Sequence, residues 1–215
     1  MQILLSDAGK RFNREWIFRH LHFEFSTHNA YAITGPNGSG KSTLLQCIGN
    51  MMQLSEGKME YINDNKPEED EKYYRFVSFS APYMEVVEEM TLTEFLRFHN
   101  QFKPFIPGMN VQMIMGIIGL EHAAKKQIAQ FSSGMKQRVK LAQAIFSDTP
   151  LLLLDEPTTN LDASGIELYH SLITEYCKEK IVIICSNDEG EYSFCTKQIV
   201  MSDYKNTNAG LQSVN

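Results

Sequence analysis

The prediction of the fold starts from Gly35-Pro36-Asn37-Gly38-Ser39-Gly40-Lys41-Ser42. This stretch matches the pattern G-x-x-x-x-G-K-[ST], whose glycines let the backbone bend so that successive N–H groups face phosphate oxygens. Residues 31–34 before it have the pattern of a buried strand and residues 43–48 after it that of a helix, which is the context the motif requires. Because a helix N-terminus adds partial positive charge, the stretch predicts a site for a nucleoside triphosphate.

Two pairs of side chains have the chemistry that such a site needs. One pair lies in the phosphate loop and the other in a second motif further along the chain. Lys41 is placed to reach the β- and γ-phosphates, and the Ser42 hydroxyl to bind Mg²⁺. Asp155 and Glu156 follow four leucines, at the end of a strand that would be covered on both faces. In phosphate-loop folds this end faces the nucleotide, so Asp155 would hold Mg²⁺ and Glu156 would polarise the attacking water. A helix cap or a surface pair is the alternative, and the apolar run before the pair disfavours it.

Composition places the chain among ordinary globular proteins and excludes several classes. Its 215 residues suffice for one substantial domain, and a net charge of −6 disfavours a nucleic-acid partner. No stretch approaches about 18 uninterrupted apolar residues, and the first residues lack the basic and apolar regions of a signal peptide. The four cysteines form no C-x-x-C pair and lie in apolar stretches, which indicates buried reduced thiols. We therefore expect a cytoplasmic protein that reaches a membrane only through a partner.

The hydrophobic pattern predicts an α/β fold with a helical insertion. Residues 91–130 have helical spacing and open with a capping box at Thr91 and Glu94, and further helices are predicted at 136–146 and 162–177. Apolar or alternating runs predict the strands. These are short strands within the first 34 residues, including Leu21–Phe25, and Lys58–Ile62, Phe76–Ser80, Leu151–Asp155, Ile181–Cys185 and Gln198–Met201.

Two features near the N-terminus have alternative interpretations. His20, His22 and His28 could indicate a metal site, but they lie on surface positions without an acidic or cysteine partner nearby, which favours solvated surface. Phe12 precedes the lysine of the phosphate loop and could either stack on a base or pack in the core. The residues leave both roles of Phe12 open.

A third motif lies between the phosphate loop and the two adjacent carboxylates. Residues 131–138 read Phe-Ser-Ser-Gly-Met-Lys-Gln-Arg, in which Ser132 is a good helix N-cap beside bare amides. In this order, residues 35–42, 131–138 and 151–156 resemble the Walker A, signature and Walker B motifs of the ATP-binding cassette (ABC) ATPases. The three motifs in this order are specific to the family, although the capped helix alone would not be.

The resemblance covers nearly the whole chain and implies an architecture. We expect a P-loop NTPase (RecA-like) core with a mostly parallel sheet, an N-terminal antiparallel β subdomain and an inserted helical subdomain. Residues 1–215 would form a single ABC ATPase domain, with its core at about 1–80 and 145–205 and its helical subdomain at about 83–145.

The resemblance also implies how the site works. In this family two domains meet head to tail, and each ATP lies between the Walker motifs of one domain and the signature of the other. Ser132 and Gly134 would then contact the γ-phosphate of an ATP held by the opposite subunit, and Asp162 would belong to the D-loop. The expected contacts to ATP are Phe12, Gly35, Pro36, Asn37, Gly38, Ser39, Gly40, Lys41, Ser42, Thr43, Ser132, Gly134 and Asp162.

Three departures from the family pattern concern turnover. Ser133 and Met135 replace a glycine and the glutamine of the usual Leu-Ser-Gly-Gly-Gln signature. The Q-loop glutamine is absent, and Ser80 would be a weak substitute as a Mg²⁺ ligand. Asn187 stands where the family has its switch histidine and cannot carry a positive charge. With Glu156 and Asn187 as the catalytic residues, we expect slower hydrolysis rather than none.

Residues 82–94 lie where the family docks the coupling helix of its membrane permease. Apolar side chains alternate here with acidic ones, and an apolar groove with an acidic rim would suit a partner helix that carries Lys or Arg. An ordinary acidic surface loop is the other interpretation. The acidic residues are Glu85, Glu88, Glu89 and Glu94.

Together these observations predict the ATP-binding and ATP-hydrolysing subunit of an ABC transporter, peripheral on the inner face of the cell membrane. Its cofactors would be ATP and Mg²⁺, and its partners a second ABC ATPase subunit and an integral membrane permease, with no nucleic acid. This subunit touches ATP and partners rather than cargo, so its residues carry no information on the transported substrate, on import or export, or on a homo- or heterodimer. The alternatives are a degenerate ATP-binding regulator with little turnover and a soluble cassette ATPase outside transport.

Overall fold

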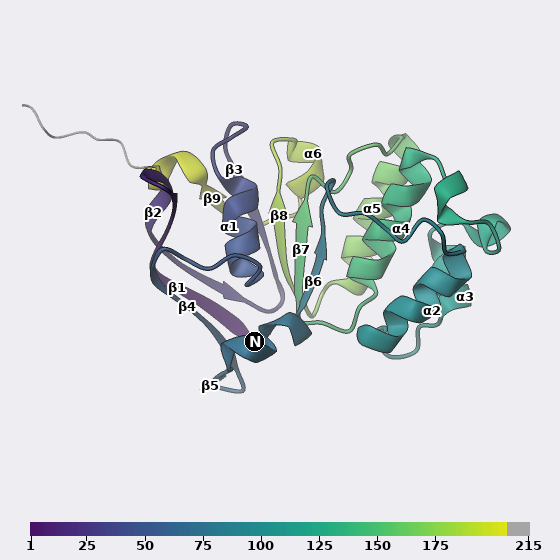
Figure 1. Ribbon diagram of the computed structural model, residues 1–215, viewed down its shortest axis with the longest axis horizontal. Coiled ribbons are helices and arrows are strands. Elements are labelled where there is room, and N and C mark those ends of the chain that lie inside the picture. Colours follow the sequence, from purple (N-terminus) through teal and green to yellow (C-terminus); the bar gives the residue numbers. More distant parts are fainter. Residues whose placement is uncertain (206–215) are drawn as a thin grey trace, which may run out of the picture.

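The computed structural model describes residues 1–205, which form two β-sheets with helices between and beside them (Figure 1). Four strands make an antiparallel sheet in the order β2-β1-β4-β5. Alternate side chains near the start of the strand at residues 2–12, such as Ile3 and Leu5, are buried, so one face of this sheet packs against the interior. The strands are β1 (Gln2–Phe12), β2 (Glu15–Ser26), β4 (Glu56–Asn63) and β5 (Lys66–Pro67).

Five strands form a second sheet in the order β6-β7-β8-β3-β9, and every neighbouring pair in it is parallel. Its two central strands, β7 and β8, are buried along their whole length, as expected for runs of leucine and isoleucine that are covered on both faces. The predicted α/β class with a mostly parallel core sheet is confirmed. The strands are β3 (Asn29–Thr34), β6 (Val77–Ser80), β7 (Leu151–Asp155), β8 (Ile181–Cys185) and β9 (Lys197–Val200).

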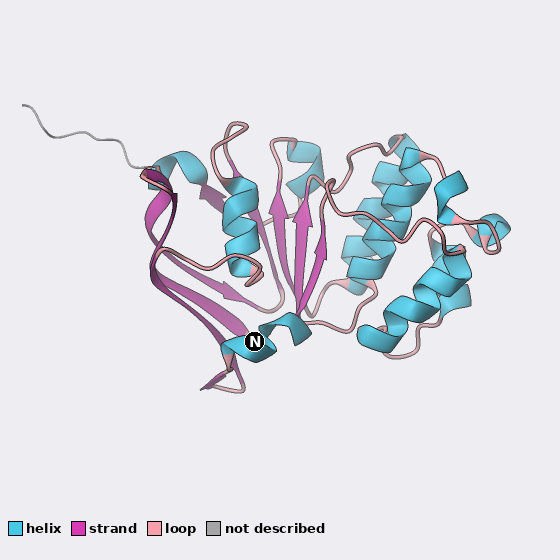
Figure 2. Ribbon diagram, in the orientation of Figure 1, coloured by secondary structure: helices cyan, strands magenta, loops and turns pink. Residues whose placement is uncertain are grey.

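Helices cover both faces of the parallel sheet (Figures 1 and 2). One helix, α1, packs between the two sheets, whereas α4 and α5 cover the opposite face, and α2 and α3 lie beyond them as the inserted helical part. Thr91 and Glu94 form the predicted capping box at the start of α2. The helices are α1 (Lys41–Ile48), α2 (Leu92–Phe102), α3 (Val111–Ile117), α4 (Ser133–Ile145), α5 (Ala163–Tyr176) and α6 (Glu189–Tyr192), with short 3₁₀ turns η1 (Asp70–Arg75), η2 (Glu121–Ala123), η3 (Ile128–Gln130) and η4 (Met201–Tyr204).

Each central strand divides its side chains between two apolar cores. Leu151 and Leu153 pack with α1 and the antiparallel sheet, whereas Leu152 and Leu154 pack with α4 and α5. This division follows from the two-residue period of a strand. Because both faces are covered, the strand ends are held firmly and fix the position of the loops that follow them.

The N-terminal strands are longer than the sequence pattern predicts. β1 and β2 have 11 and 12 residues, because irregularities near Asp7 (φ 50°) and His20 (φ 57°) interrupt the alternation without ending the ladder. His20 and His22 are exposed as expected, but they do have an acidic partner, since Asp7 Oδ1 lies 2.7 Å from His20 Nδ1. Among residues 1–205, no group of three or more His, Cys, Asp or Glu side chains could hold a metal ion.

The boundaries within the predicted single domain stay a prediction. The helices α2, α3 and α4 fall inside residues 83–145, between strands β6 and β7 of the parallel sheet, which supports an insertion at this point of the chain. Residues 206–215 of the predicted domain lie outside the described residues.

Candidate nucleotide site

The carboxyl ends of neighbouring parallel strands bring the predicted site together at one edge of the sheet. Ser80 ends β6 and Asp155 ends the adjacent strand β7, where it pairs in register with Cys185 at the end of β8. Cys185 in turn pairs with Ile33 of β3, which leads directly into the phosphate loop at residues 35–42. Loops at the carboxyl ends of parallel strands are where α/β folds bind ligands.

Two glycine conformations shape the phosphate loop. Gly35 (φ 139°) and Gly40 (φ 101°) both lie in the left-handed region of backbone space, which favours glycine. A Cβ on Gly40 would lie 2.3 Å from Ile17 Cγ2, and one on Gly35 would lie 2.9 Å from Ser39 Oγ. A side chain at either position would therefore strain the backbone and displace a neighbour, so the loop keeps its close curve only with glycine there.

Lys41 is a buried cation held by carbonyl groups. Its side chain is 6% exposed, and no ion pair within residues 1–205 includes it. The ammonium donates to the carbonyl oxygens of Gly35 at 2.7 Å and Pro36 at 3.4 Å. A buried ammonium that makes no ion pair within residues 1–205 favours an incoming anion, which would gain a charge-assisted hydrogen bond here.

Oxygen ligands suited to Mg²⁺ gather beside the loop. Asp155 is 4% exposed, and burial raises the pKa of its carboxyl group, while a hydrogen bond with Ser42 on the first turn of α1 opposes that rise. Ser80 Oγ is buried and has no hydrogen-bond partner among residues 1–205. A carboxylate and two hydroxyls fit Mg²⁺, which takes few protein ligands and completes its shell with water and phosphate oxygens. That these residues bind the ion stays a prediction.

Glu156 has an unusual backbone and faces open space. Its φ of 43° is rare outside glycine, and its N–H donates to the Cys185 carbonyl oxygen at 2.9 Å. Its side chain lines two cavities of about 340 and 330 Å³, which adjoin because Asn37 of the phosphate loop also lines both. A carboxylate at this position can reach a water molecule beside the loop.

Asn187 lies in the same space. Its Nδ2 donates to Asn37 Oδ1 of the phosphate loop at 2.8 Å, a contact between residues 150 positions apart in the chain. Asn187 and Glu156 line one cavity together. The two predicted catalytic residues are thus brought together at the loop, where the amide can donate a hydrogen bond but supplies no charge.

The signature residues lie away from this loop. Ser132 Oγ accepts a hydrogen bond from the Met135 N–H at 3.2 Å, so α4 begins at Ser133, three residues before the predicted start. A Cβ on Gly134 would lie 3.1 Å from the Asn160 carbonyl oxygen, which accounts for a glycine here. Neither signature residue lines the cavities beside the phosphate loop, so within this chain they do not complete its site.

Asp162 and Phe12 also lie outside those cavities. Asp162 Oδ1 accepts from the Gly165 N–H at 2.8 Å as the N-cap of α5, and this bond lowers the pKa of the carboxyl group. Phe12 ends β1, is 46% exposed, and carries Lys10 Nζ 5.3 Å from its ring centroid. The exposed ring argues against core packing, and its stacking on a base stays a prediction.

Sequence reasoning missed three residues beside the site. Ile17 lines the cavity at the phosphate loop. Gln46 Nε2 donates to the Tyr83 hydroxyl at 2.8 Å, on the side of α1 that carries Ser42. The spacing of four residues between Ser42 and Gln46 is a signal that could have found the glutamine. No local signal exists for Tyr83, because the contact spans 37 residues.

Comparison with known proteins agrees with this geometry. Residues 18–159 match the family model described as ABC transporter. The cytochrome c biogenesis ATP-binding export protein CcmA of Xylella fastidiosa is 31% identical over 156 residues, which cover 73% of this chain and 70% of that protein. YybJ of Bacillus subtilis, named an uncharacterized ABC transporter ATP-binding protein, is 26% identical over 182 residues, or 85% of this chain and 83% of YybJ.

Solved structures share the fold. The bacterial ABC transporter cassette MJ0796, in a dimeric structure, superposes with a TM-score of 0.77 at 24% identity and covers 92% of this chain and 93% of that one. A dimeric post-hydrolysis state of the same cassette, bound to ADP and Pi, gives a TM-score of 0.77 at 23% identity, with the same coverage of 92% and 93%. The family match and the identity with CcmA show that the chain belongs to the ABC transporter family, as one of its ATP-binding subunits.

Proposed function

We propose that this chain is a Mg²⁺-dependent ATPase whose cycle drives separate membrane subunits of a transporter. The observation that carries the proposal is the convergence of Lys41, Asp155, Glu156 and Asn187 at one edge of the parallel sheet. Lys41 would bind the β- and γ-phosphates, and Asp155 with Ser42 would hold Mg²⁺. When bound, the ion neutralises phosphate charge that builds up during transfer.

The chemical step follows from the cavity that Glu156 and Asn187 share. Glu156 accepts a proton from a water molecule as the water oxygen bonds to the γ-phosphorus. The bond from that phosphorus to the bridging oxygen breaks, which leaves ADP and inorganic phosphate. Asn187 donates a neutral hydrogen bond to the γ-phosphate, and this is weaker than the charge-assisted bond that a histidine cation would give.

A second ABC ATPase subunit would complete the site. Ser132 and Gly134 lie outside the cavities of their own phosphate loop, and MJ0796, which shares the fold, is described as dimeric. We propose that these residues contact the γ-phosphate of an ATP on the opposite subunit, with Asp162 beside them. Hydrolysis would remove the contact and let the dimer open, so that the γ-phosphate biases a two-state element.

A membrane permease would dock near residues 82–94. An apolar cavity of about 300 Å³ opens beside this segment, and Met51, Phe79, Met84 and Lys103 are among its lining residues. A helix of a partner could place apolar side chains in it. None of the helices within residues 1–205 is long and apolar enough to cross a bilayer, so any membrane-spanning part of the assembly that we propose here would come from the partner. The chain would then lie in the cytoplasm, on the inner face of the cell membrane.

Two of the four glutamates predicted to rim this groove make contacts within the chain itself. Glu88 pairs with Lys136 of α4, and Glu94 closes the capping box of α2. Glu85 and Glu89 are exposed and have no ion-pair partner among the described residues. They are the acidic residues that a basic partner helix would meet.

Phosphate release by the purified chain tests the proposed enzyme. With ATP and Mg²⁺ we expect slow release, and in excess EDTA we expect none, because the phosphate charge would then lack its neutralising ion. ATP binding without any release in Mg²⁺ would favour the degenerate regulator instead. Ser133, Met135 and Asn187 depart from the family pattern, and these departures support the degenerate regulator as a second candidate.

Charge reversal tests the docking site. The double variant Glu85→Lys/Glu89→Lys should pull down several-fold less of the membrane protein encoded beside this chain, since both charges would repel a basic helix. Basal phosphate release should stay as in the unmodified chain. The control, Glu15→Lys/Glu167→Lys, changes two exposed carboxylates on the far strand β2 and on α5 and should leave assembly intact. Equal loss in both double variants would contradict this docking surface.

A further inference from the structure

One hydrogen bond links the nucleotide edge to the start of the docking segment. The Tyr83 hydroxyl accepts from Gln46 Nε2 at 2.8 Å, and Gln46 lies one turn beyond Ser42 on α1. Partial burial raises the pKa of the Tyr83 phenol, the Gln46 hydrogen bond opposes that rise, and the nearby Asp155 carboxylate adds to it. Tyr83 therefore lies beside the residues expected to hold Mg²⁺, although its ring is 55% exposed.

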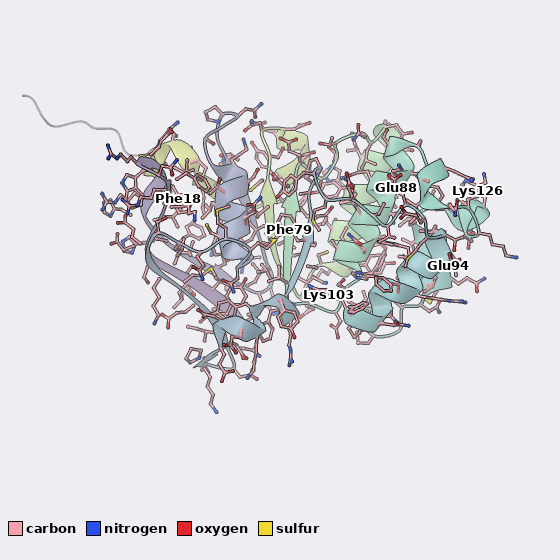
Figure 3. All side chains as sticks on the ribbon, viewed as in Figure 1. Phe18, Phe79, Glu88, Glu94, Lys103 and Lys126 are labelled. Carbon is pink, nitrogen blue, oxygen red and sulfur yellow. The ribbon has the colours of Figure 1, made fainter. Side chains whose placement is uncertain are left out.

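Other contacts fix the backbone around Tyr83. Phe79 lies near the end of β6 (Figure 3). Its ring centroid is 6.4 Å from that of Tyr83. Lys140 of α4 is buried and donates to the carbonyl oxygens of Ala81 at 3.4 Å and Pro82 at 3.2 Å. The backbone just before Tyr83 is therefore held against α4.

The rear of the segment is bonded to the chain that leads into the signature. The Ala129 N–H donates to the Glu88 carbonyl oxygen and the Ile128 N–H to that of Met90, both at 2.9 Å. The Glu88 side chain also pairs with Lys136 on the first turn of α4. The segment therefore spans from the nucleotide edge at Tyr83 to the helix that Ser132 caps.

We propose that Gln46 and Tyr83 form a positioning pair that transmits occupancy of the Mg²⁺–nucleotide site to residues 82–90. The pair would supply the link that the absent Q-loop glutamine leaves open, with the amide coming from α1 and the hydroxyl from the segment. Neither residue is catalytic, since each acts through Ser42, Asp155 and the segment backbone. The inference rests on the proposed function, because the pair can transmit occupancy of the site only if the chain binds a nucleotide.

Hydrogen exchange of the segment tests this pair directly. In the full chain, Mg²⁺ with the non-hydrolysable analogue AMP-PNP should slow amide exchange within residues 82–90 by about three- to tenfold, the effect of one neutral hydrogen bond. Tyr83→Phe removes only the hydroxyl, and Gln46→Met keeps the length of the side chain without its amide. Each should reduce the slowing to less than about twofold, and the double variant should do no more, since the pair acts as a unit.

Controls separate this inference from the proposed function. Tyr176→Phe on α5, where the ring packs on Phe146, removes a hydroxyl far from the segment and should behave like the unmodified chain. AMP-PNP binding is measured in the same samples, and both single variants should keep it within about threefold. If the unmodified chain fails to bind the analogue, the proposed function fails. If it binds and residues 82–90 respond equally in all variants, or respond in none, the pair is overturned.

Discussion

Two parts of the candidate site are built in opposite ways. One is the phosphate loop at residues 35–42, and the other is the proposed sensing edge, formed by Gln46, Ser80, Tyr83 and Asn187. The loop is contiguous, and its main contact, from Lys41 to the Gly35 carbonyl, spans six residues. At the sensing edge, Gln46 meets Tyr83 across 37 residues and Asn187 meets Asn37 across 150. The loop matches its motif at every required position, whereas the edge lacks the glutamine and the histidine that the family pattern has. The proposed binding of ATP thus depends on local sequence, whereas the proposed response to binding depends on how distant segments fold together.

The two regions also differ in charge. The loop contains the buried cation Lys41, which would face the phosphates of ATP, and charge-assisted hydrogen bonds are roughly twice as strong as neutral ones. The sensing edge offers an amide at Asn187, a phenol at Tyr83 and an unpartnered hydroxyl at Ser80. We therefore expect ordinary affinity for ATP combined with slow turnover.

The largest expected effect comes from removing the cation of the loop. Lys41→Ala should weaken ATP binding at least about 100-fold, because it deletes charge-assisted bonds to two phosphates. Equilibrium binding of ATP in Mg²⁺ measures this. Lys58→Ala is the matched control, since that exposed lysine on β4 pairs only with Glu60 and should leave binding unchanged. Equal affinity in both variants would show that the loop does not carry binding.

A substitution at the sensing edge should have a smaller effect, and it should change turnover rather than ATP binding. Asn187→His replaces a neutral donor with one that can carry charge, which is worth about 1 kcal/mol and should raise turnover roughly five- to tenfold. The affinity for ATP should stay nearly constant, because the loop is untouched. Steady-state phosphate release checks the rate. An unchanged or lower rate would mean that position 187 does not limit turnover.

The smallest effect concerns stability without ligand. Burial raises the folded-state pKa of Asp155 above its usual value of about 3.8, so ionisation of this group opposes folding as the pH rises through that window. At pH 7 the nucleotide-free Asp155→Asn variant should melt a few degrees higher than the unmodified chain, since about 1 kcal/mol shifts Tm by 2–4 °C at this size. The gain should shrink as the pH falls toward 4, because protonation of Asp155 removes the cost of burying its charge.

Ligand should reverse the order of the two melting temperatures. With Mg²⁺ and ATP the unmodified chain should gain more stability than Asp155→Asn, because binding to the folded state alone stabilises it. Thermal unfolding with and without Mg²⁺–ATP at both pH values gives the four comparisons. A variant that is less stable than the unmodified chain at pH 7 without ligand would contradict the assigned cost of burying this carboxylate.

Local pattern was sufficient for much of this architecture. The all-apolar strands at 151–155 and 181–185, the cap at Ser132 and the capping box at Thr91 are as predicted, because each depends on neighbours within a few residues. The phosphate loop lies at the expected strand end for the same reason.

Contacts between distant segments account for what the sequence pattern missed. Ile17 reaches the phosphate loop only because β2 lies against it, and Gln46 meets Tyr83 only once β6 is placed beside α1. The acidic partner of His20 is Asp7 on the neighbouring strand, which becomes visible only with the register of β1 and β2. Glu88 was expected to rim a groove for a basic partner helix, and it pairs instead with Lys136 across 48 residues.

The central claim is that the loop binds ATP and Glu156 activates the water that hydrolyses it. Paired measurements on the unmodified chain and Glu156→Gln, of ATP affinity and of phosphate release in a single turnover, test it most directly. The account predicts equal affinity within about threefold and a release rate at least about 100-fold lower in the variant, since an amide cannot accept the proton. Release from Glu156→Gln at the rate of the unmodified chain would contradict the account.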